Sequence, residues 1–284
     1  MTGSVGSYGR FVWYELMTTD VAAAAAFYTE VVGWGARDAS TPDTTYTLMT
    51  VGDRAVGGVM GLPEDARKAG ATPRWVGYVG VGDVDAAADR TARLGGIVHV
   101  PPMDIADISR IAIVADPQMA MFGLITMREA DPERAAAAGA PGCVGWHELL
   151  AADANAALAF YAELLGWQKA ETGFDPGGMY QLFSVGGQMI GGMFTKPAMV
   201  AMPFWLYYFG VGDIDAAAER TRAAGGEIIE GPLDVMGGAW VVRCIDPQGA
   251  MFALIGSRGK NSAGYFERTA SRSQSDARGR RWSW

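Results

Sequence analysis

A phrase of 22 residues occurs twice in this chain. WYELMTTDVAAAAAFYTEVVGW occupies residues 13–34, and WHELLAADANAALAFYAELLGW occupies residues 146–167. Tryptophan, glutamate, aspartate, Phe-Tyr and Gly-Trp recur between the copies at a constant offset of 133. Because similar sequences fold into similar local units, the repeat limits the chain to architectures that contain this unit more than once.

Two later segments also repeat. VGDVDAAADRTARLGG (81–96) matches VGDIDAAAERTRAAGG (211–226) at 11 of 16 positions, and DPQMAMFGLI (116–125) matches DPQGAMFALI (246–255). Both pairs are offset by 130, so a net deletion of three residues separates them from the first repeat. The repeats therefore run through most of the chain in the same order.

This order predicts two homologous domains, over residues 8–128 and 142–258. The alanine-rich segment 129–141 is expected to be a linker. Residues 259–284 carry six basic and two acidic side chains and lack apolar periodicity. They are expected to form a disordered basic tail, with a docking peptide as the alternative.

A shorter spacing recurs four times within these repeats. In each case an aspartate follows a strand-like run, and a glycine stands 13 residues later. Aspartate accepts a hydrogen bond from a free N–H at a helix start, and glycine adopts the left-handed conformation just after a helix end. Short runs with strand composition follow each glycine, so the sequence predicts four strand–helix–strands modules. The four pairs are Asp20 and Gly33, Asp83 and Gly96, Asp153 and Gly166, and Asp213 and Gly226.

Composition limits the classes of partner and the cellular setting. Half of the 284 residues are hydrophobic and the formal charge is −8, which argues against a nucleic-acid partner. Cys143 and Cys244 form no disulfide or zinc pattern, which favours a reducing cytoplasm. No signal peptide and no apolar window long enough to cross a membrane is evident. The tandem arrangement is compatible with a monomer or a homodimer.

The pattern D…FY…GW after the first strand and the closing DPxGAMFxLI resemble the vicinal oxygen chelate superfamily. This superfamily includes glyoxalase I, the bleomycin resistance proteins and the extradiol dioxygenases. The resemblance covers about 250 of 284 residues, and the pattern WxEL…D…FY…GW in particular resembles the tandem two-domain, hydroxylase-annotated proteins of actinobacteria. It implies an α+β fold in which four βαβββ modules pair into two domains with cup-shaped mixed sheets. Each cup would hold a small molecule.

The resemblance also implies positions for a divalent metal, with ligands from the first and last strands of a module. Those positions hold Trp13, Val76, Trp146, Leu206, Gly123 and Ala253, none of which binds a metal through its side chain. His99 and His147 have no partners at ligand spacing and are interpreted as structural or solvated. No metal site is expected, and the sequence assigns no cofactor.

The repeated glutamates, Glu15 and Glu148, are the candidate catalytic residues. Strand alternation would place each of them in a cup, where loss of water raises the pKa of a carboxyl group toward that of a general acid or base. The alternative is structural: each carboxylate could accept backbone N–H groups, or could pair with an arginine such as Arg243 across the domain interface.

The candidate ligand-binding residues are aromatic or contain sulfur, as a flat apolar ligand would require. Many such residues could instead belong to the core or the domain interface. Tyr78 and Tyr208 lie on the same strands as some of the candidates. The candidates are Trp13, Met17, Tyr46, Met60, Trp75, Trp146, Tyr180, Trp205 and Tyr207.

Three functions remain open from the sequence. The first is a metal-independent enzyme of secondary metabolism or detoxification, which acts on an apolar or aromatic small molecule with a cup glutamate as proton shuttle. Isomerase, cyclase, lyase and hydroxylase-type steps all fit. The second is non-catalytic sequestration of an antibiotic or metabolite. The third, disfavoured by the absent ligands, is a metal-dependent glyoxalase or dioxygenase.

Overall fold

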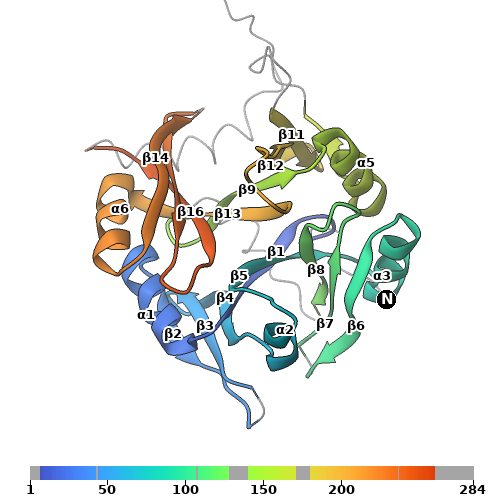
Figure 1. Ribbon diagram of the computed structural model, residues 1–284, viewed down its shortest axis with the longest axis horizontal. Coiled ribbons are helices and arrows are strands. Elements are labelled where there is room, and N and C mark those ends of the chain that lie inside the picture. Colours follow the sequence, from blue (N-terminus) through green and yellow to red (C-terminus); the bar gives the residue numbers. More distant parts are fainter. Residues whose placement is uncertain are drawn as a thin grey trace, which may run out of the picture.

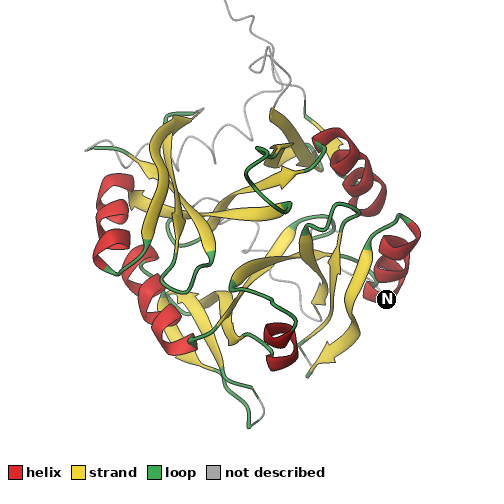
Figure 2. Ribbon diagram, in the orientation of Figure 1, coloured by secondary structure: helices red, strands yellow, loops and turns green. Residues whose placement is uncertain are grey.

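The computed structural model describes residues 7–42, 44–106, 108–127, 140–170, 180–235 and 237–259. Most of the expected linker and the tail from residue 260 onward lie outside the described residues. The described chain forms two large sheets with helices packed on their outer sides (Figures 1 and 2). No helix in the described ranges is long and apolar enough to cross a membrane.

The first domain consists of two modules joined by the short helix α2. Its first module contains β1 (Phe11–Thr18), α1 (Val21–Val32), β2 (Gly35–Asp38), β3 (Tyr46–Val51) and β4 (Arg54–Gly61). After α2 (Glu64–Lys68), its second module contains β5 (Arg74–Gly80), α3 (Val84–Arg93), β6 (Ile97–Ile105), β7 (Ser109–Ala115) and β8 (Met121–Met127).

The second domain repeats this order of elements. Its first module contains β9 (Val144–Ala151), α5 (Ala154–Leu165), β10 (Gln168–Lys169), β11 (Tyr180–Val185) and β12 (Gln188–Thr195). Its second module contains β13 (Phe204–Asp213), α6 (Ile214–Ala223), β14 (Glu227–Val235), β15 (Ala239–Ile245) and β16 (Met251–Ser257). The expected four strand–helix–strands modules are confirmed.

Each domain folds its two modules into one eight-stranded mixed sheet. The strand order is β2-β3-β4-β1-β5-β8-β7-β6 in the first domain, and the corresponding strands follow the same order in the second. β1 runs parallel to β4 and antiparallel to β5, so the first strands of the two modules meet at the centre of the sheet. The open, cup-like face of each sheet lies opposite the face that the helices cover.

The aspartates begin all four long helices, as predicted. The side chains of Asp20, Asp83, Asp153 and Asp213 each accept a hydrogen bond from a backbone N–H in the first turn. The predicted glycine ends are correct for α1 and α5, where Gly33 and Gly166 are left-handed. They are wrong by one residue for α3 and α6, where Gly95 and Gly225 take the left-handed conformation that ends the helix.

The repeated aromatic motifs hold the two domains together. Tyr28 of the first Phe-Tyr pair donates to the buried carboxylate of Asp246 in the second domain at 3.1 Å. Tyr161 of the second pair donates to Asp116 of the first domain, also at 3.1 Å. The two contacts are equivalent under the repeat, because each DPQ aspartate receives the tyrosine of the opposite domain. Figure 1 shows the resulting pairing of α1 beside α6 and of α3 beside α5.

The Gly-Trp tryptophans make a second equivalent pair of contacts between the domains. The indole N–H of Trp34 donates to the carbonyl oxygen of Gly142 at 2.6 Å, and that of Trp167 donates to Gly9 at 2.7 Å. Both tryptophans belong to one apolar core that the two domains share. The phrase that opens each domain is therefore also the phrase that attaches it to the other domain.

Candidate functional site

The alternation of β1 separates a core face from a cup face. Tyr14 and Leu16 pack into the core shared by the domains, whereas Trp13 and Met17 pack on the opposite face. Glu15 lies between Trp13 and Met17 on that second face, as predicted. We name cup 1 the face formed by Trp13, Glu15, Met17, Val76, Tyr78 and Ile113. Cup 2 is the equivalent face of the second domain, formed by Trp146, Glu148, Leu150, Leu206, Tyr208 and Arg243.

Two phenols enclose the carboxylate of Glu15 in cup 1. Tyr46 donates to its Oε1 at 2.9 Å, and Tyr78 donates to its Oε2 at 2.7 Å. Glu15 is 8% exposed, and within the described residues it has no ion pair with a basic side chain. The residue is thus a buried acid that is hydrogen-bonded but has no countercharge.

Glycines make room for both phenols. A Cβ added to Gly58, the β4 partner of Glu15, would lie 2.0 Å from the Tyr46 hydroxyl oxygen. A Cβ added to Gly123 on β8 would lie 2.1 Å from the ring of Tyr78. Only glycine allows the rings to lie so close to the backbone and reach Glu15. Gly123 was singled out only as a position for a metal ligand, and Gly58 was not singled out, although the repeated Gly-Gly within the strands at 57–58 and 191–192 was a visible signal.

Burial controls protonation in cup 1. Desolvation raises the pKa of Glu15, and the hydrogen bonds from Tyr78 and Tyr46 oppose this rise only in part. Burial and the nearby Glu15 charge also raise the pKa of Tyr46 and Tyr78, so both phenols remain protonated donors. The pKa of Glu15 is therefore raised in the direction of neutral pH. A carboxyl group whose pKa is near the working pH can both donate and accept a proton.

Cup 2 repeats the two phenols and adds an arginine. Tyr180 donates to Glu148 at 2.9 Å and Tyr208 donates at 2.8 Å. Arg243 donates to the same carboxylate at 2.7 Å and forms an ion pair with it. Both partners belong to the second domain, so the predicted pairing of Glu148 with Arg243 is confirmed, but its expected location across the domain interface is wrong.

The two cups therefore differ in charge. Arg243 uses its other nitrogens to bind Glu230 and the hydroxyl of Tyr208, so its donors are engaged. Its equivalent in cup 1, at the offset of 130, is Ile113, which is apolar and buried. Within the described ranges, the glutamate of cup 2 therefore has a cationic partner and that of cup 1 has none.

Several predicted ligand-binding residues do lie on the cup faces. Trp13 hydrogen-bonds to Tyr46, and the indole N–H of Trp146 donates to Tyr180 at 2.9 Å. The chain Trp–Tyr–Glu is thus present in both cups. Met60 pairs with both Met17 and Tyr46 in the sheet register, which places these three on the same face. They are half-buried, so they form an apolar wall beside Glu15.

Trp75, Trp205 and Tyr207 are not on the cup faces, and their expected place in the cup wall is wrong. Trp75 and Trp205 point to the core, where they donate to Tyr28 at 2.8 Å and Tyr161 at 3.0 Å. The hydroxyl of Tyr207 accepts the backbone N–H of Gly77 at 2.7 Å across the domain boundary. Trp75 lies on the same strand as Tyr78, and Trp205 and Tyr207 lie on the same strand as Tyr208. Because side chains alternate along a strand, these three point to the core face and not to the cup face.

The two histidines have the structural and solvated roles expected of them. His99 is exposed on β6, and His147 is buried between the domains. Nδ1 of His147 lies 2.6 Å from the carbonyl oxygen of Ile190, so Nδ1 carries the proton. Nε2 then accepts the hydroxyl of Tyr14 at 2.6 Å, while Phe11 stacks on the imidazole ring. Tyr14 and His147 are equivalent positions of the repeat and meet at the interface.

Because His147 is buried in its neutral form, we expect the folded protein to lose stability at acid pH. Burial lowers the pKa of His147 from 6.5 to about 4. Between these pH values the imidazole binds a proton in the unfolded state but not in the folded state. The stability due to the neutral ring is present above pH 6.5 and is lost as the pH falls to 4. From pH 7 to pH 4, the wild type should lose about 3 kcal/mol more unfolding free energy than His147→Gln. Urea unfolding at a series of pH values measures this, and parallel profiles for the two proteins would contradict it.

The residues at the family positions do not fit a metal ion. Trp13, Val76 and Gly123 occupy those positions in cup 1, and the Tyr78 ring fills the space above Gly123. In the part of the chain that the structure describes, no three His, Cys, Asp or Glu side chains are grouped to hold a metal.

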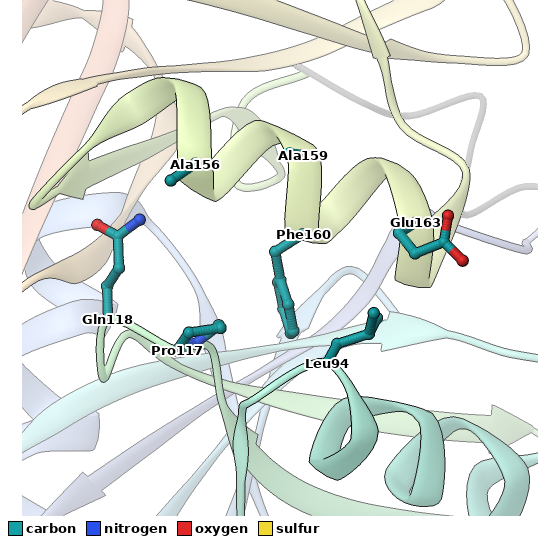
Figure 3. A pocket seen from close by; sticks show the side chains of 7 residues that line it. All are labelled: Leu94, Pro117, Gln118, Ala156, Ala159, Phe160 and Glu163. Atoms are coloured by element: carbon teal, nitrogen blue, oxygen red, sulfur yellow. The ribbon is translucent and has the colours of Figure 1, made fainter.

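A separate hollow of about 370 Å³ lies outside both cups. It separates α5 from the end of α3 and from the turn before β8, and Phe160 points into it between Leu94 and Pro117 (Figure 3). At the equivalent place in the other half of the interface, Phe27 packs against Gly226. The hollow therefore arises from looser packing of one of the two equivalent helix pairs.

Comparison with known proteins agrees with this architecture. The model of the Glyoxalase/Bleomycin resistance protein/Dioxygenase superfamily matches residues 10–124 and again residues 144–254. The chain belongs to this superfamily. Each match coincides with one eight-stranded domain, so the resemblance drawn from the repeated motifs is confirmed.

Two relatives match nearly the whole superfamily region. CFP32 of Mycobacterium tuberculosis, a protein named provisionally as a glyoxylase, is 34% identical over 245 residues, which cover 86% of this chain and 93% of CFP32. The anthracycline biosynthesis protein DnrV of Streptomyces peucetius is 32% identical over 259 residues, which cover 87% of this chain and 93% of DnrV. One homologue of this superfamily chain thus belongs to secondary metabolism.

Solved structures share the fold at low identity. The Mn(II)-bound glyoxalase from Novosphingobium aromaticivorans superposes with a TM-score of 0.59 at 14% identity, covering 88% of this chain and 82% of that chain. The 2,3-dioxygenase LapB from Pseudomonas sp. KL28 superposes with a TM-score of 0.61 at 12% identity, covering 90% and 94%. These likenesses concern the fold alone.

Proposed function

We propose that this protein is a metal-independent enzyme of secondary metabolism or detoxification, and that cup 1 is its working site. Glu15 transfers a proton to or from an apolar or aromatic small molecule there. One observation carries the proposal: among the residues that the structure describes, Glu15 is buried without a countercharge, whereas Glu148 forms an ion pair with Arg243. Of the two candidate catalytic glutamates, Glu15 is the one whose pKa burial raises and which no arginine binds in the described part of the chain.

The geometry suits a carboxyl group that acts as a proton shuttle. Tyr46 and Tyr78 fix the two carboxylate oxygens and stabilise the anion after the proton leaves. Burial has the opposite effect, because it stabilises the neutral acid. The balance supports a group that takes a proton from an activated C–H or O–H and returns it elsewhere on the ligand. Isomerisation, cyclisation and elimination all contain such a step.

The comparisons support the class of ligand. DnrV is named for anthracycline biosynthesis, and it shares 32% identity with this chain over most of both lengths. A polycyclic aromatic ligand also fits the indole of Trp13 and the methionines of cup 1. The cytoplasm remains the predicted location, in keeping with the unpaired cysteines Cys143 and Cys244.

A second candidate function is sequestration without chemistry. Cup 2 favours it, since Arg243, Tyr180 and Tyr208 already satisfy Glu148 and the surrounding Trp146 and Phe194 are apolar. Such a surface can bind a flat molecule, while its glutamate is held by the two phenols and the arginine.

The Glu15→Gln variant separates the two functions. The probe is 2-tetralone, an aromatic ketone with acidic α-hydrogens, and the measurement is its uptake of deuterium from D₂O by NMR. Wild type should accelerate exchange, and Glu15→Gln should lower the rate by about 10² or more while the dissociation constant changes little. The control Glu30→Gln, on the exposed side of α1, should exchange at the wild-type rate. Binding without any accelerated exchange in wild type would favour sequestration.

A further inference from the structure

The outer edge of cup 1 contains an arginine that the proton transfer does not use. Arg74 on β5 pairs with Met17 in the sheet register, and Met17 in turn pairs with Met60 on β4. The three side chains therefore form a row across the cup face, beside the row that contains Glu15. We name this set, with the neighbouring Met121, the outer row of cup 1.

Arg74 is half-buried and has few partners. Its Nε donates to the carbonyl oxygen of Thr72 at 3.0 Å, and its Nη1 lies 3.3 Å from the sulfur of Met121. Among the described residues, no carboxylate forms an ion pair with it. A thioether is a weak acceptor, and burial lowers the pKa of this guanidinium. The cation is thus partly desolvated and lacks a negatively charged partner.

The equivalent row of cup 2 shows that the fold does not require this charge. There the residues are Phe194, Leu150 and Phe204, at the positions of Met60, Met17 and Arg74. Phe204, at the position of Arg74, packs against the apolar residues of cup 2. The arginine of cup 2 lies in the interior beside its glutamate, whereas that of cup 1 lies at the edge, apart from Glu15.

We propose that the outer row of cup 1 is an anion-binding site for a planar aromatic ligand that carries an anionic oxygen, as in a carboxylate. The guanidinium of Arg74 binds the anion through its free donors, and the methionines contact the ring. Planar guanidinium groups match carboxylate oxygens in geometry as well as charge. This inference rests on the proposed function, because it names the ligand of the same cup.

The spacing between Arg74 and Glu15 suits this ligand. Glu15 pairs with Val76, so Arg74 is its diagonal neighbour, about 7–8 Å away between backbones. The two side chains form no ion pair, although they carry complementary groups on one face. An aromatic ring bound by its anionic group at Arg74 would extend toward Glu15, which places a ring substituent near the proton-transfer group.

The test compares 2-naphthoate with the uncharged 2-naphthamide by isothermal titration calorimetry at pH 7.5. Wild type should bind naphthoate at least about tenfold more tightly, as expected for a charge-assisted hydrogen bond. Arg74→Phe, which installs the residue of cup 2, should bind both probes with affinities within about twofold. Arg74→Lys should retain part of the preference, because it keeps the charge but loses the planar geometry.

Two further variants make the test specific. Arg110→Gln removes a half-buried arginine that binds Asp85 on the helix side of the sheet, and it should retain the wild-type preference. Glu15→Gln should also retain the preference for naphthoate over naphthamide. Because this variant removes the proton-transfer group, anion binding can be tested separately from the proton transfer. The inference is overturned if wild type does not favour naphthoate, or if the preference survives in Arg74→Phe.

Discussion

Replacement of Arg243 by methionine is expected to lower the free energy of unfolding by about 3–5 kcal/mol at pH 7. The change leaves Glu148, whose side chain is 4% exposed, with two phenols but no countercharge. A charged carboxylate without a partner is costly to bury, whereas methionine replaces the aliphatic part of arginine. Urea unfolding measured by circular dichroism gives the loss directly.

The double variant Glu148→Gln/Arg243→Met serves as the control. Removing both charges should recover most of the lost stability, because no buried ion is left without a partner. At the equivalent position in cup 1, Ile113→Val should cost only about 0.5–1.5 kcal/mol, since it removes one buried methylene group. A loss below 1 kcal/mol for Arg243→Met would show that cup 2 does not depend on the ion pair.

Replacement of Asp246 by alanine should also cost about 3–5 kcal/mol. This carboxylate is 3% exposed and accepts the backbone N–H groups of Gln248 and Ala250 at 3.0 and 2.8 Å. It also accepts the hydroxyl of Tyr28 from the other domain. Alanine would leave the Ala250 N–H and the Tyr28 hydroxyl buried without an acceptor. Chemical denaturation followed by tryptophan fluorescence measures the change.

Matched variants separate the turn from the interface. Tyr28→Phe keeps the DPQ turn but removes the contact with Asp246 and the acceptor of the Trp75 indole N–H, and it should cost about 1–3 kcal/mol. Asp116→Ala changes the equivalent aspartate, which accepts from Gln118, Ala120 and Tyr161, and should cost as much as Asp246→Ala. A small loss for both aspartate variants would mean that the repeated DPQ turn is not a principal domain contact.

Local patterns in the sequence were sufficient for the modules. The spacing from aspartate to glycine predicted the four helices because capping depends on side chains within a few residues of each helix end. It was one residue wrong at Gly96 and Gly226, where two adjacent glycines could both end the helix and only the backbone geometry distinguishes them. The face of Glu15 on β1 also followed from strand alternation, which is local.

The candidate site was predictable only in part. Glu15, Tyr46, Met17 and Met60 lie together on the cup face as expected, because neighbouring strands in register bring them there. Trp75, Trp205 and Tyr207 were assigned to the cups from composition, but they lie on the other face. Arg74 was not identified, although comparison with Phe204 in the repeat shows the replacement of an apolar residue by a charged one.

The sequence by itself determined that this protein has two homologous domains, four modules, and one glutamate in the first strand of each domain. These features depend on repeats, caps and alternation, all of which operate over a few residues. The sequence offered the pairing of Glu148 with Arg243 as one of two alternatives, and the tertiary structure decided between them. Glu148 and Arg243 are 95 residues apart in the chain and become partners through the order of strands in the sheet. In the described part of the chain Glu15 has no such partner, because the equivalent position on β7 is Ile113.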